Sequence, residues 1–132
     1  GSTFIVGGQI KDQPPELYLV YPQGNYIRPA DSKPYLVIGE VKYGKPILDR
    51  VITPKVSIGD ASRCALISMD STLKSDLTVG PPIDFAVIKK DEIKIASLKC
   101  LNMNDPEFSK VCNQWSQGIF KIFDSFQRFD WE

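Results

Sequence analysis

The 132-residue chain has no histidine and only three cysteines. Without histidine, neither Ser-His-Asp nor Cys-His catalysis can be assembled within the chain, and most transition metals lose their commonest ligand. Cys64, Cys100 and Cys112 lie far apart and form no C-x-x-C pair, which argues against a zinc site and against a disulfide framework. We therefore expect reduced thiols, a cytoplasmic protein, and no metal or other cofactor.

An excess charge of one sign and a long apolar run are also lacking. The 16 basic residues balance the 16 acidic ones, and no basic stripe points to nucleic acid as a partner. No apolar run approaches the roughly 20 residues that span a bilayer, so no membrane partner is indicated. With 42% hydrophobic residues, the chain can nevertheless build the core of one ordinary domain.

The apolar patterns predict strands first and then helices. Strands are expected over residues 3–10, 17–21 and 34–39, with a short strand and a loop over 26–33. A helix should start near Gly44, because Pro46 is tolerated only in a first turn, and should end before Pro54. A second helix should run from Ile58 to Leu73 or beyond, with Ser57 and Asp60 as a capping pair.

A hairpin and a long helix complete the pattern. The hairpin strands are expected over 83–89 and 93–101, joined by a turn at 90–92. Asp105-Pro106-Glu107 is a strong helix start, and apolar residues follow at helical spacing: Phe108, Val111, Cys112, Trp115, Ile119, Ile122, Phe123 and Phe126. The chain is therefore predicted to be α+β, and the aromatic stripe is interpreted as core or subunit interface.

The densest polar cluster is "MDSTLKSD", residues 69–76. One interpretation is a solvated helix end, and another is a group of carboxylates and hydroxyls that orients a catalytic group supplied from elsewhere. The S-x-x-K match of Ser71 and Lys74 leaves a third, weak hypothesis of a serine acyl-transferase, whose partner motifs S-D-N and K-T-G are absent. With no histidine to lower a thiol pKa, the cysteines are better interpreted as packing residues.

Several longer stretches resemble a known family. "YPQGNYI", "IGEVKYGKPILDRVI" and "SMDSTLKSDLTVGPPIDFAVIKKDEI", together with the final helix, are similar to the carboxyl-terminal half of the Anbu family. These are bacterial proteasome-type peptidases, named as ancestral beta subunits. The resemblance extends from about Thr3 to Phe126. Gly1-Ser2 resemble a tag remnant, and residues 3–132 are expected to be the carboxyl-terminal part of a proteasome-type peptidase domain.

The resemblance implies a partial αββα sandwich of the N-terminal nucleophile hydrolase, or proteasome-like, class. Strands 3–10 and 17–21 would belong to one sheet, and strands 34–39, 83–89 and 93–101 to the other. The helices within 45–75 would form one outer layer, and the last helix would lie on the other. Half of such a sandwich would expose sheet edges and apolar faces, so self-association is also expected.

The resemblance also implies site residues. Asp70 would be the aspartate that supports the catalytic threonine, Ser71 or Ser75 the neighbouring serine, and Glu40 would line the strand-to-helix turn where many members have a serine. The nucleophile would be an amino-terminal threonine outside this chain. Thr3 is not that residue, because Gly1-Ser2 block its amine.

The implied function is that of a carboxyl-terminal fragment of a threonine-type endopeptidase, inactive alone. Its parent would degrade peptides or unfolded proteins and form homo-oligomeric rings or open helical assemblies. The alternative is a non-catalytic assembly or scaffold subunit with the same fold.

Overall fold

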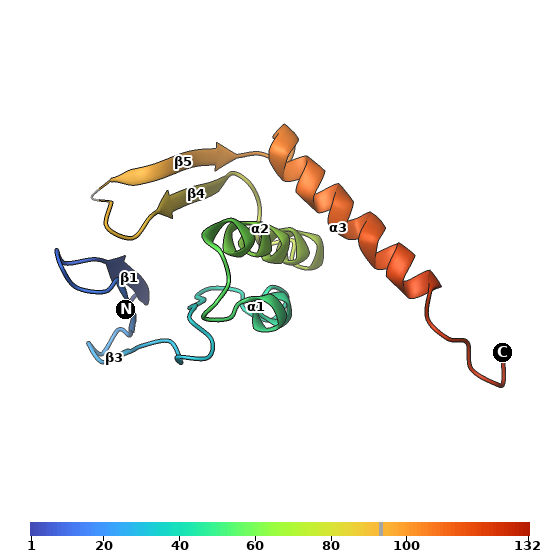
Figure 1. The fold of residues 1–132 in the computed structure, drawn as a ribbon, viewed down its shortest axis with the longest axis horizontal. Helices are drawn as coiled ribbons and strands as arrows, with labels where there is room; N and C mark the ends of the chain where they lie inside the picture. The colour runs from blue at the N-terminus through green and yellow to red at the C-terminus, as the bar shows by residue number, and fades with distance from the viewer. Residues whose placement is uncertain (93) are drawn as a thin grey trace.

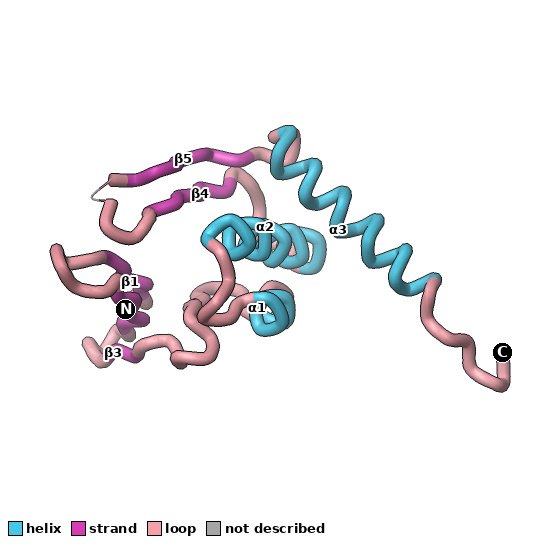
Figure 2. The backbone as a smooth tube through the Cα atoms, viewed as in Figure 1, coloured by secondary structure: helices cyan, strands magenta, loops and turns pink. Residues whose placement is uncertain are grey.

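The computed structural model describes residues 1–92 and 94–132. In chain order the elements are β1 (Phe4–Gly8), β2 (Glu16–Val20), β3 (Tyr26–Ile27), α1 (Lys45–Val51), α2 (Ile58–Ser75), β4 (Ile83–Ile88), β5 (Ile95–Leu101) and α3 (Pro106–Asp124) (Figures 1 and 2). The chain is therefore α+β, as predicted. Ile93, expected to start the second hairpin strand, lies outside the described residues.

The first sheet has the strand order β1-β2-β3. β1 and β2 are antiparallel, with Phe4 opposite Val20 and Gly8 opposite Glu16. This confirms that the segments 3–10 and 17–21 belong to one sheet, although β1 is shorter than predicted and β2 begins and ends one residue earlier. β3 adds only the pairs of Leu19 with Ile27 and Val20 with Tyr26, so the sheet narrows at this edge.

The predicted strand at 34–39 is wrong. Residues 34–38 have no regular secondary structure and form no ladder with any described strand. Tyr35 and Val37 instead pack against a buried cluster of Leu48 on α1, Ile52 directly after α1, and Cys64 on α2. The apolar pattern of this segment thus reflects its burial against helices. A regular strand and an irregular extended segment can both be buried in this way, so the pattern does not distinguish them.

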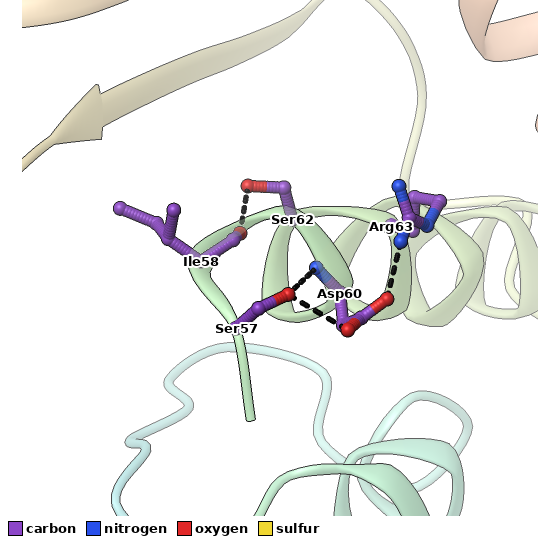
Figure 3. Close-up of polar contacts among 5 residues, drawn as sticks. All are labelled: Ser57, Ile58, Asp60, Ser62 and Arg63. Carbon is purple, nitrogen blue, oxygen red and sulfur yellow. Dashed lines mark hydrogen bonds and ion pairs between the residues drawn. The ribbon is translucent and has the colours of Figure 1, made fainter. Parts of the chain in front are cut away.

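The two predicted helix starts at Ser57 and Asp105 are confirmed. Ser57 Oγ accepts a hydrogen bond of 3.0 Å from the Asp60 backbone N–H and donates one of 2.7 Å to the Asp60 carboxylate (Figure 3). Asp60 also pairs with Arg63, one turn further along α2. At α3, the Asp105 carboxylate accepts from the N–H groups of Glu107 and Phe108. These caps satisfy donors that have no partner within the helix itself.

The hairpin β4–β5 and the helices α2 and α3 share one core. β4 and β5 are antiparallel, with Ile83 opposite Leu101. The cluster consists of Ile83, Leu101, Phe108 and Cys112, with Leu66, Met69, Leu73 and Phe85 packed against it. The expectation that α3 lies on the layer opposite α1 and α2 is therefore wrong. Residues of α2 and α3 pack in the same cluster with the hairpin, and α3 lies beside α2 (Figure 1).

The two sheets meet at the tip of the hairpin. Gln9, which follows β1, donates from Nε2 to the Asp91 carboxylate at 2.7 Å, and Gln9 Oε1 accepts from the Asp91 backbone N–H at 2.7 Å. A cavity of about 690 Å³ lies beside this contact, lined mainly by charged residues of both tips. The 34–39 segment contributes to neither sheet. The expected sheets of two and three strands are therefore, among the described residues, sheets of three and two: β3 joins the first sheet, and the second has β4 and β5 alone.

The chain leaves much of its apolar surface uncovered. Its accessible area is 10174 Å², whereas a compact monomer of this mass exposes about 7,000 Å². Every residue of β1 is exposed, including Phe4 and Val6, and Leu98 projects from β5 into solvent. No described helix combines the length and apolar character needed to cross a membrane.

Candidate functional site

The turn at residues 39–44 lies directly against α2. Gly39 has φ +82°, a left-handed conformation that side chains other than glycine rarely adopt. At Gly44, an added Cβ would lie 2.9 Å from Ser68 Oγ and 3.1 Å from the Ser68 carbonyl oxygen. The turn therefore contacts α2 closely at Ser68, and glycine at position 44 leaves room for this contact.

The turn and the end of α2 bring two carboxylates together. Asp76 caps the carboxyl end of α2, and its carboxylate accepts from the Thr78 hydroxyl at 2.6 Å and from the Thr78 N–H at 2.8 Å. The pKa of Asp76 is lowered chiefly by the Thr78 hydroxyl and N–H, which donate to its carboxylate, and further by the charge of Lys42. Lys42 Nζ is 3.9 Å from Glu40 Oε1. We call Glu40, Lys42, Asp76 and Thr78 the turn cluster.

Asp70 lies elsewhere, in the interface between α2 and α3. Its side chain is only 2% exposed, and Oδ2 accepts a hydrogen bond of 2.8 Å from Lys74 Nζ. Lys74 also donates to Ser116 Oγ on α3 at 3.2 Å. Asp70 Oδ1 is buried without a hydrogen-bond partner among the described residues. Asp70 is thus a buried interhelical carboxylate, and the structure does not bring it to Glu40.

Helix geometry explains why the two carboxylates diverge. Ser68, Thr72 and Asp76 recur every four residues, so they share the face of α2 that meets the turn. Asp70 is two residues from Ser68, about 200° around the helix, and therefore faces α3. Asp76 belongs to the polar cluster 69–76 noted in the sequence but was not singled out as a site residue, although its spacing of eight residues from Ser68 places it on the same face.

Ser71 and Ser75 lie one turn apart on α2. Ser71 is partly buried and Ser75, the last residue of the helix, is exposed. Among the described residues, neither hydroxyl has a hydrogen-bond partner, and Lys74 is engaged by Asp70 and Ser116 rather than by Ser71. The geometry therefore gives Ser71 no lysine base. The acyl-transferase hypothesis requires a contact between Ser71 and Lys74, and the structure does not show one.

The thiols are poor nucleophiles in this structure. Cys64 and Cys112 are buried, and burial raises the pKa of both. The pKa of Cys112 rises to about 11, with a further contribution from the neighbouring Asp70 carboxylate. Cys100 is exposed, but partial desolvation and the charge of Asp84 raise its pKa as well. A raised pKa lowers the thiolate fraction, which agrees with a packing role.

No protein-family model matches the chain, and no curated protein does. Solved structures do match. Anbu from Hyphomicrobium sp. strain MC1 is 42% identical with a TM-score of 0.92, over 97% of this chain and 55% of that one. The protein in the helical assembly of the Anbu complex from Pseudomonas aeruginosa is 42% identical with a TM-score of 0.90, over 96% and 53%. Anbu from Yersinia bercovieri is 40% identical with a TM-score of 0.91, over 96% and 53%.

These similarities define the class of the fold as a partial N-terminal nucleophile hydrolase sandwich of proteasome-like type. At this identity and over nearly its whole length, the chain belongs to the Anbu family. It spans about half of the length of the solved Anbu chains that it matches.

Proposed function

We propose that this chain is the carboxyl-terminal part of a proteasome-like threonine-type endopeptidase that degrades proteins, and that it does not carry the nucleophile. The observation that carries the proposal is the agreement with Anbu structures at a TM-score of 0.92, which covers nearly all of this chain but only 55% of that relative. The excess of accessible surface over that of a compact monomer supports the same conclusion, since a complementary segment would cover it.

The proposed chemistry divides between the two parts. An amino-terminal threonine on the complementary segment would attack the peptide carbonyl, with its own α-amine as the general base for the hydroxyl. This chain would supply the surroundings. Glu40 and Asp76 can accept hydrogen bonds from an amine placed beside the turn, and their charges would hold and orient it. The low pKa of Asp76 keeps this carboxylate ionised in neutral solution.

Ser71 and Ser75 are proposed to support the same region from the neighbouring face of α2. Asp70 would act indirectly, because its contacts with Lys74, and through Lys74 with Ser116, fix α2 against α3. Peptides or unfolded proteins are the proposed substrates, and a cytoplasmic location is supported by three free cysteines. Assembly into a homo-oligomer is proposed from the helical assembly described for the Pseudomonas aeruginosa relative.

A non-catalytic scaffold subunit is the second candidate. It is favoured by Glu40, which stands at the turn where proteasome-type peptidases often place a serine, and by the helical assembly of that relative. A scaffold would use the same fold and the same complementary segment, but it would bind that segment without hydrolysing peptides.

Reconstitution separates the two candidates. The chain is mixed with the segment of the Hyphomicrobium relative that it does not match, prepared with a free amino-terminal threonine, and hydrolysis of a fluorogenic peptide is measured. We expect no turnover by either part, turnover by the mixture, and its loss when that threonine is changed to alanine. A complex without turnover would support the scaffold, and turnover by this chain alone would contradict the proposal.

The same assay tests the turn cluster. Asp76→Asn should lower kcat/KM of the reconstituted enzyme by at least about tenfold, which corresponds to about 1.4 kcal/mol of transition-state stabilisation. Asp31→Asn removes the same charge from an exposed position outside the turn cluster and serves as the matched control. Equal activities of the two variants would remove Asp76 from the proposed site.

A further inference from the structure

The second half of α3 has no partner within this chain. Phe108 and Cys112, in the first half, are 1% and 7% exposed in the core. The carboxyl-terminal half of α3 extends away from the rest of the molecule, and the chain terminus lies beyond it, at the end of a short loop (Figure 1). Large apolar residues there are 47–79% exposed. We call this set the α3 apolar end: Ile119, Phe120, Ile122, Phe123, Phe126, Phe129 and Trp131.

The α3 apolar end continues the buried stripe of the same helix. The stripe of Phe108 and Cys112 continues through Trp115 to Ile119, Ile122 and Phe123. Cys112, Trp115, Ile119 and Ile122 are three or four residues apart and Phe123 is four residues from Ile119, so these residues lie on one face. The rings of Phe123 and Phe126 meet edge to face at 6.0 Å, and those of Phe129 and Trp131 stack at 5.4 Å. The aromatic rings are thus ordered against one another, while their outer surfaces remain in solvent.

The exposed area has the size of an interface. The aromatic rings of the α3 apolar end together expose on the order of 700 Å², taking typical areas for these side chains. A standard protein–protein interface buries about 800 Å² on each partner. A monomer rarely exposes a continuous apolar patch of this extent, so we expect a binding partner to cover this surface.

The position and the charges of the α3 apolar end indicate which partner it binds. A segment that completed the two sheets would dock at β1–β3 and β4–β5, which lie on the opposite side of the molecule from the free end of α3 (Figures 1 and 2). The polar residues around the α3 apolar end include Lys121 and Asp124, of opposite charge, so identical surfaces would not repel each other. A membrane-binding helix would instead carry several lysines or arginines on its polar face.

We propose that the α3 apolar end binds the same surface of a second copy of this chain, around a two-fold axis. The two helices cross face to face, and each covers the aromatic rings of the other, as an isologous interface requires. This inference rests on the proposed homo-oligomeric function and names the surface of one contact within the oligomer: a pairwise contact, distinct from the head-to-tail contact that extends an open helical assembly.

Cysteine crosslinking tests the contact directly. In a Cys100→Ser background, which removes the exposed native thiol, Phe123→Cys is compared with Gln117→Cys on the opposite face of α3. Under mild oxidation we expect at least tenfold more disulfide-linked dimer from Phe123→Cys, because a residue near a two-fold axis meets its own copy. Equal crosslinking at the two positions would overturn the proposal.

Sedimentation provides the second measurement. The double variant Phe123→Ser/Phe126→Ser should raise the dissociation constant for self-association at least tenfold, whereas Leu98→Ser, at an equally exposed position on β5, should leave it unchanged. Unchanged association of the α3 variant would overturn the proposal, as would binding to anionic phosphatidylserine vesicles in place of self-association. A chain that crosslinks but gives no turnover in the reconstitution contradicts the proposed peptidase function alone, and the converse result contradicts this inference alone.

Discussion

Lys74 Nζ donates a 2.8 Å hydrogen bond to Asp70 Oδ2, and the two residues differ sharply in exposure: the lysine side chain is 55% exposed and the aspartate 2%. Lys74 therefore brings its charge from the surface to a carboxylate that has no other cation beside it among the described contacts. The second carboxylate oxygen, Oδ1, has no partner within the same residues. The stability of the α2–α3 interface should depend on this contact.

Lys74→Met removes the charge and keeps most of the aliphatic stem. Because it leaves an unpaired buried carboxylate, we expect it to lower the free energy of unfolding by about 2–3 kcal/mol, measured by urea denaturation. Adding Asp70→Asn to this variant should recover part of the loss, since the uncompensated charge is then absent. A Lys74→Met variant as stable as the parent chain would show that Asp70 does not need this partner.

The contact between Gly44 and Ser68 predicts a steric effect. Gly44→Ala places a Cβ 2.9 Å from Ser68 Oγ, and the neighbouring backbone carbonyl at 3.1 Å cannot rotate away. We expect a loss of about 1–3 kcal/mol in the free energy of unfolding, as for other overpacked contacts. Gly118→Ala is the matched control. Nothing lies within 4 Å of its Cβ, so alanine should stabilise α3 by up to about 1 kcal/mol.

The turn cluster predicts a pH effect. The pKa of folded Asp76 lies below its ordinary value of 3.8, chiefly because of the Thr78 hydroxyl. Its contribution to stability is therefore complete above about pH 4 and is lost as the pH falls through the folded pKa. In an NMR titration, Thr78→Val should raise the pKa of Asp76 and leave that of Asp60, which depends on Ser57 and Arg63, unchanged. Equal movement of both would indicate a global change of structure.

The thiols predict an order of reactivity. Cys100 is exposed and should react first with iodoacetamide in the folded chain, whereas Cys64 and Cys112 should react only after unfolding. With a pKa of about 11, Cys112 is ionised in about one molecule in a thousand at pH 8. Mass spectrometry of a time course gives the order. Early modification of Cys112 would mean that the α2–α3 interface opens readily.

The Cys112 thiol also predicts how the free energy of unfolding changes at alkaline pH. The pKa of Cys112 rises on folding from 9.0 to about 11, so the folded state favours the neutral form. The resulting stability is present below pH 9.0 and decreases as the pH rises towards about 11. Cys112→Ser, which does not titrate in this range, should flatten that part of the stability profile.

Local signals allowed the helix boundaries to be predicted. Ser57, Pro46 and Asp105 act within one helical turn of themselves, so their effect can be read from neighbouring residues. The family resemblance supplied the class of fold, which the Anbu structures confirm.

Features that depend on packing between distant parts of the chain could not be predicted from the sequence. Tyr35 and Val37 have the apolar pattern of a strand, but their burial comes from α1 and α2 rather than from a neighbouring strand. The position of α3 beside α2 likewise depends on the shared face of the β4–β5 hairpin. At the candidate site, the sequence placed Asp76 in the polar cluster 69–76 but did not relate it to the turn at residues 39–44. That relation joins a helix end to a turn more than thirty residues earlier in the chain, and no local signal reports it.

Hydrogen exchange tests the central claim most directly: that the open sheets of this chain are completed by the part of the Anbu fold that it does not match. The backbone amides of β1 and of the β4–β5 hairpin are followed by mass spectrometry, before and after addition of the unmatched segment of the Hyphomicrobium relative. We predict that exchange of these amides slows at least tenfold, while the free end of α3 is unaffected. Unchanged exchange at both sheets with a saturating excess of the segment would contradict the account.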